Sequence, residues 1–158
     1  MEKTYTLTQA HTYFGVEFNN AIFPLLEKEN RTKEEDLHLL NLAHAAMLHW
    51  QNNPKHTIVN MQRAQYMLAC AYTFTQHKDM ALMYARLCFE TTQNNLSEMQ
   101  DFDVAYAHLA LARALALNGD SRAKEIKQKA LELGNNLSNE GDKKYFLSDM
   151  KVGSWFGG

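Results

Sequence analysis

Histidines are the side chains of this sequence best suited to hold a metal ion, and the chain contains seven of them. His44 and His49 would sit about 140° apart around a helix, so their rings would not converge on one ion. His38 and His49 would share a helical face, but about 16 Å of helix would separate them. No two histidines have the i, i+4 spacing of zinc ligands on a helix. The spacing therefore predicts no metal site.

Acid–base or nucleophilic chemistry has similarly weak support in the sequence. Asp101 and His108 would share one stripe of a helix but lie about 10 Å apart, too far for a hydrogen bond. Asp101 and Asp103 are better interpreted as helix caps. Cys70 and Cys88 lie in apolar stretches without the spacing of a redox or zinc pair, so we expect buried thiols. No nucleophile elbow or phosphate loop occurs, and we expect no catalysis and no cofactor.

Almost the whole chain has the apolar periodicity of amphipathic helices, and no segment alternates with period two for long enough to predict a strand. Its 158 residues, 46% hydrophobic, fit one domain over 1–158. Thr8 is expected to cap the first helix, and Thr32 with Glu35 forms a capping-box signature for the second. The fold class expected is all-α. The predicted helices span about 9–28, 32–51, from Pro54 or Thr57 to 76, 79–92, 101–118, 120–134 and 140–150.

The charge balance and the beginning of the chain bear on partners and location. Sixteen basic and eighteen acidic residues leave a formal charge of −2, which gives no reason to expect nucleic acid. The first residues lack the apolar core of a signal peptide, and no apolar run reaches the ~18 residues of a membrane span. We therefore expect a cytoplasmic protein that does not bind membranes.

Three segments repeat one pattern, in which a large residue precedes a small one and a second large residue follows three positions later. They are FGVEF (14–18), LACAY (68–72) and, more loosely, LARAL (111–115). Small side chains at Gly15, Ala69 and Ala112 would let two helices approach closely. Recurrence of one such contact is typical of stacked helical repeats.

At these residues the chain resembles the tetratricopeptide repeat family. The signature of the family's first helix falls on Leu68, Ala69 and Tyr72, and the small residues of its second helix fall on Ala81 and Cys88. The segment 101–120 is also similar to one in small bacterial tetratricopeptide-like proteins of unassigned function. The resemblance implies a right-handed stack of antiparallel hairpins. These would cover about 9–52, 55–92 and 101–134, followed by a capping helix at 140–150 and a flexible tail at 153–158.

In such a stack, the first helix of each hairpin lines a concave wall. Steps of three, four and three residues keep the lining residues of each helix on one stripe. The residues so predicted are Gln9, Thr12, Val16 and Asn19, then Arg63, Tyr66, Cys70 and Thr73, then Tyr106, Leu109, Arg113 and Ala116. The strongest candidates for binding a partner are Asn19, Arg63, Tyr66, Cys70, Thr73, Tyr106 and Arg113.

The mixture of aromatic, amide and guanidinium groups in this groove suits an extended peptide or an acidic tail. We therefore expect a non-catalytic module that binds another protein or peptide. Alternatively, Arg63 and Tyr66 only cover an edge of the core, with their stems packed and their tips in water.

Two other functions stay open at this stage. The chain could be a homodimeric scaffold that pairs through its ends, where aromatic residues gather. These are Tyr5, Tyr13 and Phe14 at one end, and Tyr145, Phe146, Trp155 and Phe156 at the other. It could also be a small-molecule enzyme or binder with a pocket inside a closed bundle, which predicts perturbed titrating groups in that pocket.

Overall fold

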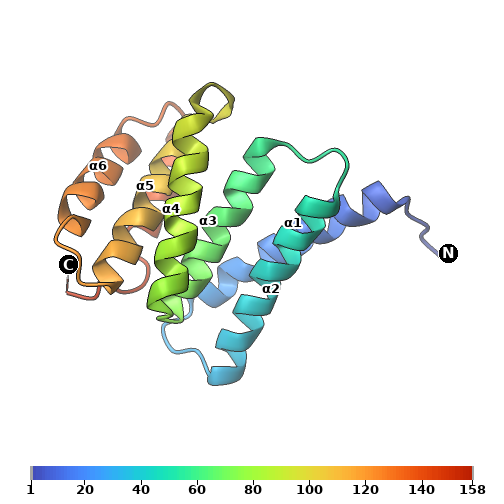
Figure 1. The fold of residues 1–158 in the computed structure, drawn as a ribbon, viewed down its shortest axis with the longest axis horizontal. Helices are drawn as coiled ribbons and strands as arrows, with labels where there is room; N and C mark the ends of the chain where they lie inside the picture. Colours follow the sequence, from blue (N-terminus) through green and yellow to red (C-terminus); the bar gives the residue numbers. More distant parts are fainter. Residues whose placement is uncertain (1, 158) are drawn as a thin grey trace.

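A computed structural model describes residues 2–157, and these form seven α-helices, one short 3-10 helix and no strand (Figure 1). The all-α prediction is confirmed. The helices are α1 (Leu7–Glu27), α2 (Lys33–Asn52), α3 (Ile58–Phe74), α4 (Lys78–Asn94), α5 (Asp101–Leu117), α6 (Ala123–Asn135) and α7 (Glu140–Asp149), with the 3-10 helix η1 (Leu96–Glu98) between α4 and α5.

Capping boxes decide where the first helices begin. Thr6 caps α1, because its hydroxyl accepts from Gln9 N–H while the Gln9 side chain accepts from Thr6 N–H. The cap predicted at Thr8 was therefore wrong by two residues. Thr32 and Glu35 form the predicted capping box at the start of α2.

The acidic residues at the start of α5 do not act as the cap itself. Gln100 is the N-cap, and Asp103, three residues on, accepts from its backbone N–H at 3.0 Å. Asp101 instead accepts from the N–H and the hydroxyl of Ser138, both at 2.8 Å. The prediction that one of these aspartates is the cap was wrong, although Asp103 completes a capping box.

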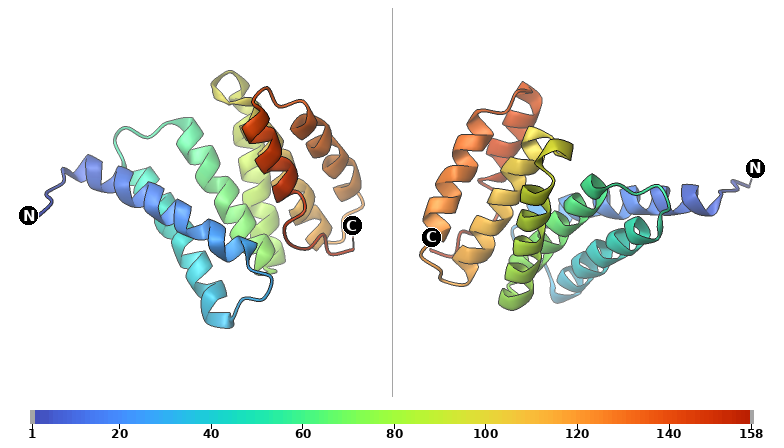
Figure 2. Two further views of the ribbon diagram at one scale, coloured as in Figure 1. Left: turned by 180° about the vertical axis from the view of Figure 1, so that it is seen from behind. Right: turned by 45° about the horizontal axis from the view of Figure 1, so that its top comes forward.

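Successive helices pack against one another all the way from α1 to α6, and α7 packs on α5 and α6. The odd-numbered helices also touch, because α1 contacts α3 and α3 contacts α5. Viewed from behind, α1 and α7 lie on the same side of the molecule, in front of α3 and α5 (Figure 2). Antiparallel hairpins lie side by side, and the right-handed superhelix stays a prediction.

The three small residues of the repeated pattern lie at close contacts between helices. Gly15 is buried against Trp50, and a Cβ atom added to it would lie 2.9 Å from the indole ring. Ala69 and Ala112 are fully buried. Because their side chains are small, the helices around them can pack as closely as the pattern predicts.

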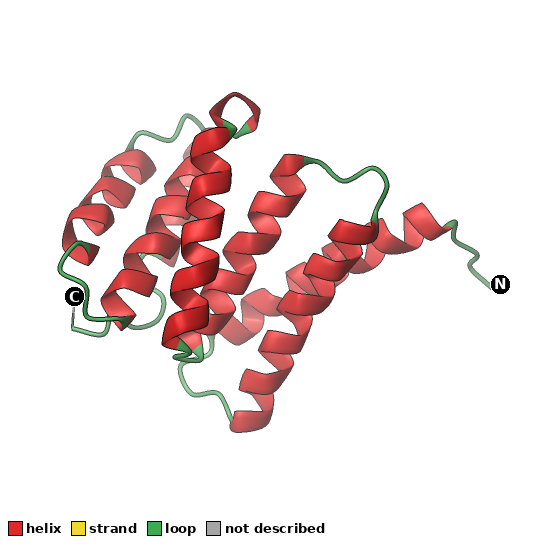
Figure 3. Ribbon diagram, viewed as in Figure 1, coloured by secondary structure: helices red, strands yellow, loops and turns green. Residues whose placement is uncertain are grey.

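The chain after α6 folds back over the repeats. Phe146 of α7 is fully buried, and a Cβ atom on Gly134 of α6 would collide with its ring. The interpretation of Phe146 as an exposed pairing residue was therefore wrong. After α7, residues 150–156 form an irregular segment (Figure 3). Within this segment Trp155 Nε1 donates to Met150 O at 3.0 Å. The tail's predicted flexibility stays a prediction, and its residue 158 lies outside the described residues.

Candidate partner-binding surface

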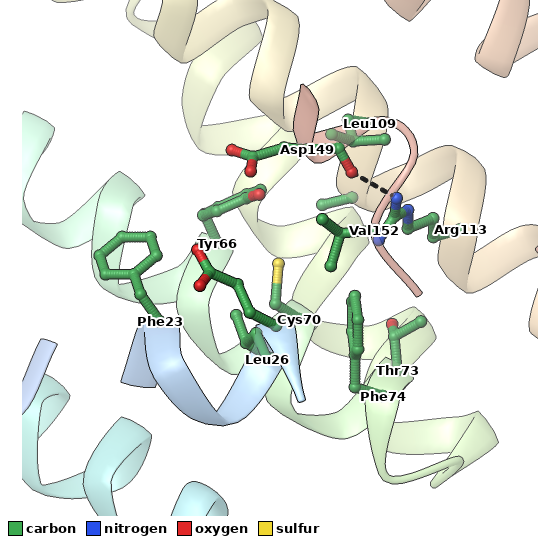
Figure 4. A pocket seen from close by; sticks show the side chains of 12 residues that line it. Phe23, Leu26, Tyr66, Cys70, Thr73, Phe74, Leu109, Arg113, Asp149 and Val152 are labelled. Atoms are coloured by element: carbon green, nitrogen blue, oxygen red, sulfur yellow. Dashed lines mark hydrogen bonds between the residues drawn. The ribbon is translucent and has the colours of Figure 1, made fainter. Parts of the chain in front are cut away.

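The seven strongest candidates all line two adjoining hollows between α1, α3, α5 and the C-terminal segment. The first hollow, with a volume of about 40 Å³, is lined by Tyr66, Cys70, Thr73 and Arg113 (Figure 4). The second, of about 180 Å³, is lined by Asn19, Arg63, Tyr66 and Tyr106. Both hollows share Phe23, Tyr66 and Asp149. We call the surface formed by these two hollows the α3–α5 surface.

Of the other predicted lining residues, only Leu109 reaches one of these hollows. The Gln9 side chain caps α1, and the Thr12 hydroxyl accepts from Asn53 Nδ2 at 2.8 Å. Val16 is exposed elsewhere on α1, and Ala116 is buried in a cluster with α6. The prediction for these four residues was wrong, because three of them lie in the first half of α1, outside both hollows, and Ala116 packs against α6 instead.

Arg63 already has a carboxylate partner. Its Nε and Nη2 donate to the two carboxylate oxygens of Asp103 at 2.8 and 3.1 Å, and its guanidinium lies 4.9 Å from the centre of the Phe102 ring. The Asp103 side chain is 2% exposed, whereas that of Arg63 is 46% exposed. This bidentate pair fixes the orientation of the guanidinium and leaves one side of it open to a partner.

Arg113 is almost completely buried, at 4% exposure, by the C-terminal segment. Its Nη2 donates to Asp149 O at 2.7 Å, and its guanidinium lies about 5 Å from the ring centres of both Phe74 and Trp155. Burial lowers the pKa of Arg113. Its Nε has no hydrogen-bond partner within the described chain. The side chain thus anchors the C-terminal segment to α5.

The rings and the thiol between the two arginines form the floor of the surface. Tyr66 and Tyr106 meet edge to face at 5.2 Å, and the Tyr106 hydroxyl donates to Asp149 Oδ2. Burial raises the pKa of Tyr66 well above its usual value and raises that of Cys70 to about 11. The Cys70 thiol is therefore protonated at neutral pH and is a poor nucleophile. The prediction that Cys70 and Cys88 are buried thiols is confirmed.

Two carboxylates at this surface, those of Asp149 and Glu27, have no cation paired with them in the part of the chain that the structure describes. Burial raises the pKa of Asp149, the Tyr106 hydroxyl and Arg113 lower it, and the nearby Glu27 raises it. Both carboxylates line the first hollow. Within the described chain, neither forms an ion pair shorter than 4 Å.

Sequence reasoning missed Phe23, Asp103, Asp149 and Val152 as residues of this surface. Phe23 and Val152 lie outside the aligned stripes, at the end of α1 and after the last helix. Asp149 reaches the surface only because α7 folds back onto α5. Asp103 was interpreted as a cap, and the proximity of Arg63, 40 residues away, has no local signal.

No family model, no curated protein and no solved structure matches this chain.

The structure does not bring the catalytic and metal candidates together. Asp101 binds Ser138, while His108 Nδ1 bonds to Val104 O at 2.8 Å. His44 Nε2 is hydrogen-bonded to the Tyr72 hydroxyl at 2.7 Å. Across residues 2–157 there is no cluster of three or more metal-ligating side chains, and none of the helices there has the length and apolarity to cross a membrane.

Proposed function

We propose that this protein is a non-catalytic interaction module whose α3–α5 surface binds an extended peptide of another protein. One observation carries the proposal. Seven residues chosen from stripes on three separate helices line two adjoining hollows on one face of the molecule. With volumes of about 40 and 180 Å³, the hollows are too small for a drug-sized ligand and suit single side chains of an extended peptide.

The groups that remain open at this surface fit a peptide backbone and apolar side chains. Phe23 is 44% exposed between the hollows, where a peptide side chain could pack on its ring. Asn19 forms no side-chain hydrogen bond within the described chain, so its amide can bond to a peptide backbone.

The charges of the surface favour a neutral or basic peptide over an acidic tail. Asp103 already pairs with Arg63, and the C-terminal segment covers Arg113. An acidic tail would have to displace a carboxylate from Arg63 and would approach the side chains of Glu27 and Asp149, which form no ion pair among the described residues.

Selection of phage-displayed random dodecapeptides on the full chain, followed by calorimetric titration of the selected peptide, tests this proposal. Phe23→Ala is expected to weaken binding at least tenfold, because a large exposed ring at the centre of a contact carries much of its affinity. Phe14→Ala is the matched control. Phe14 is also an exposed phenylalanine of α1, at 40%, but it does not line either hollow. Equal affinities for the two variants, or no selected peptide, would contradict the proposal.

A homodimer is the second candidate, favoured by exposed rings just before α1 and in its N-terminal half. Tyr5, Tyr13 and Phe14 are all more than one third exposed. The centre of the Tyr13 ring lies 5.7 Å from that of Tyr5 and 5.2 Å from that of Phe14. A dimer through this patch predicts that Tyr13→Ser with Phe14→Ser halves the mass measured by light scattering. A wild-type mass that stays monomeric across a dilution series would exclude it.

A further inference from the structure

Two histidines from different helices face each other at the start of the first hairpin. His11 of α1 and His49 of α2 place their Nδ1 atoms 3.0 Å apart, with ring centres 5.2 Å apart. They are 38 residues apart in sequence. No short-range spacing could reveal this pair, and the peptide-binding proposal does not use it.

Packed helices hold both rings in place. The ring of His49 contacts those of Phe14 and Phe18, with centres 5.3 and 5.6 Å away. The Gly15–Trp50 contact fixes the two helices beside this pair, because Trp50 follows His49 directly and Gly15 lies one helical turn after His11. The nitrogens are thus positioned by regular elements, which is the condition for a preorganised metal site.

A metal ion is ligated by the neutral form of an imidazole. The 3.0 Å contact between the two Nδ1 atoms is a hydrogen bond in which one Nδ1 carries a proton and the other accepts it. Neither Nε2 has a hydrogen-bond partner within the described chain, so the shared proton can move to the Nε2 of its own ring. That tautomer exposes both Nδ1 lone pairs without a net release of protons.

The distance between the two nitrogens matches one type of coordination. Metal–nitrogen bonds of about 2.0–2.1 Å to atoms 3.0 Å apart enclose an angle of about 94°. That is close to the cis angle of a square-planar or octahedral ion, whereas a tetrahedral ion needs nitrogens about 3.3–3.4 Å apart.

We propose that His11 and His49 form a site for a divalent transition-metal ion that prefers imidazole, with Cu²⁺ the best match in geometry. Only these two side chains would ligate it, because no third histidine, cysteine or carboxylate joins them in the described chain. Water would fill the remaining positions. The bound ion would cross-link α1 to α2 and stabilise the first hairpin, because it binds the folded chain more tightly than the unfolded one.

The experiment titrates the full chain, free of any added histidine tag, with CuCl₂. It combines competition calorimetry with electron paramagnetic resonance and thermal unfolding. The wild type is expected to bind one Cu²⁺ with nitrogen hyperfine coupling from two imidazoles and to unfold at a higher temperature when loaded. His11→Ala is expected to bind at least tenfold more weakly and to lose that increase. His56→Ala, in the loop before α3, is the matched control and is expected to behave as the wild type.

Three results would overturn the proposal. These are an absence of Cu²⁺ binding by the wild type, coupling to a single imidazole, and an equal affinity in His11→Ala. Should His11→Ala fail to fold, the histidine ring ¹⁵N spectrum of the wild type with substoichiometric Cu²⁺ decides. The Nδ1 signals of His11 and His49 must both broaden more than those of His56, and unbroadened signals would refute the site.

Discussion

The α3–α5 surface differs from the outer surface of the first hairpin, which is formed by His11, Tyr13 and Phe14. The two surfaces have similar types of side chain in different surroundings. At the α3–α5 surface, Arg63 and Arg113 are held by Asp103 and by the backbone of Asp149. On the outer surface, the rings of Tyr13 and Phe14 are exposed, and His11 has His49 as its partner. Internal partners hold charged groups in place, whereas exposed rings mark where another molecule can pack. The C-terminal segment causes this difference, because it covers Arg113 at the α3–α5 surface and leaves the rings of the outer surface exposed.

The largest expected effect comes from removing Phe146, the buried ring that anchors the C-terminal segment. Phe146→Ala deletes a fully buried ring between α7 and α6, so we expect a loss of about 3–5 kcal/mol in the free energy of unfolding. Denaturant titration measures it, and Trp155 should become more exposed in fluorescence. Tyr145→Ala, at a 73% exposed neighbour, should change stability by less than about 0.5 kcal/mol. Equal effects of the two variants would show that α7 is not docked.

Asp103→Asn tests the ion pair that occupies the α3–α5 surface. It removes charge-assisted hydrogen bonds to Arg63 and to Gln100 N–H, so we expect a loss of about 1.5–3 kcal/mol. Lys129→Ala breaks an exposed pair with Glu132 and should have an effect near zero, below about 1 kcal/mol. A similarly small effect for Asp103→Asn would mean that Arg63 is free to take another carboxylate.

Gly15→Ala probes the close approach of helices in the first hairpin. The added methyl group would lie 2.9 Å from the Trp50 ring and cost about 1–3 kcal/mol, while better helix propensity returns about 1 kcal/mol. We expect a net loss of about 1 kcal/mol in chemical denaturation. A net gain in stability would show that α1 and α2 are farther apart at this position.

The smallest expected effect is a pH dependence through His108. Burial lowers the pKa of this imidazole below the unfolded value of about 6.5, so the folded state binds fewer protons. The stability it supports is present above pH 6.5 and is lost as the pH falls through 6.5 and below. His108→Asn should reduce the loss measured by thermal unfolding between pH 7 and 5. The lowered pKa of His49 acts in the same direction, so some of the loss should persist. A pH profile of His108→Asn identical to that of the wild type would contradict this account.

Helical spacing predicted what lies within one helix. Arg63, Tyr66, Cys70 and Thr73 share a stripe because steps of three and four residues return to one side of a helix, and all four line the surface. The Thr32 cap was predicted because both members of its box are close in sequence. At α1, Thr6 displaced Thr8 because Gln9 lies three residues after Thr6 and completes the box.

Contacts between distant segments could not be predicted from spacing. Asp149 meets Tyr106 and Arg113 only because α7 folds back over α5, and nothing in the repeated pattern describes the chain after its last unit. Phe146 was assigned to an exposed end because aromatic residues gather there in the sequence, whereas the space beside Gly134 admits its ring. Two residues on one stripe can also differ in what they contact. Asn19 of α1 lines one of the hollows, whereas Val16 is exposed outside both.

The most direct test of the account is to locate a selected peptide by amide and methyl chemical-shift mapping on the full chain. Binding at the α3–α5 surface predicts the largest shifts at Asn19, Phe23, Leu109 and Val152, with small shifts at Tyr13 and Phe14. Largest shifts at Tyr13 and Phe14, with the α3–α5 surface unmoved, would contradict it.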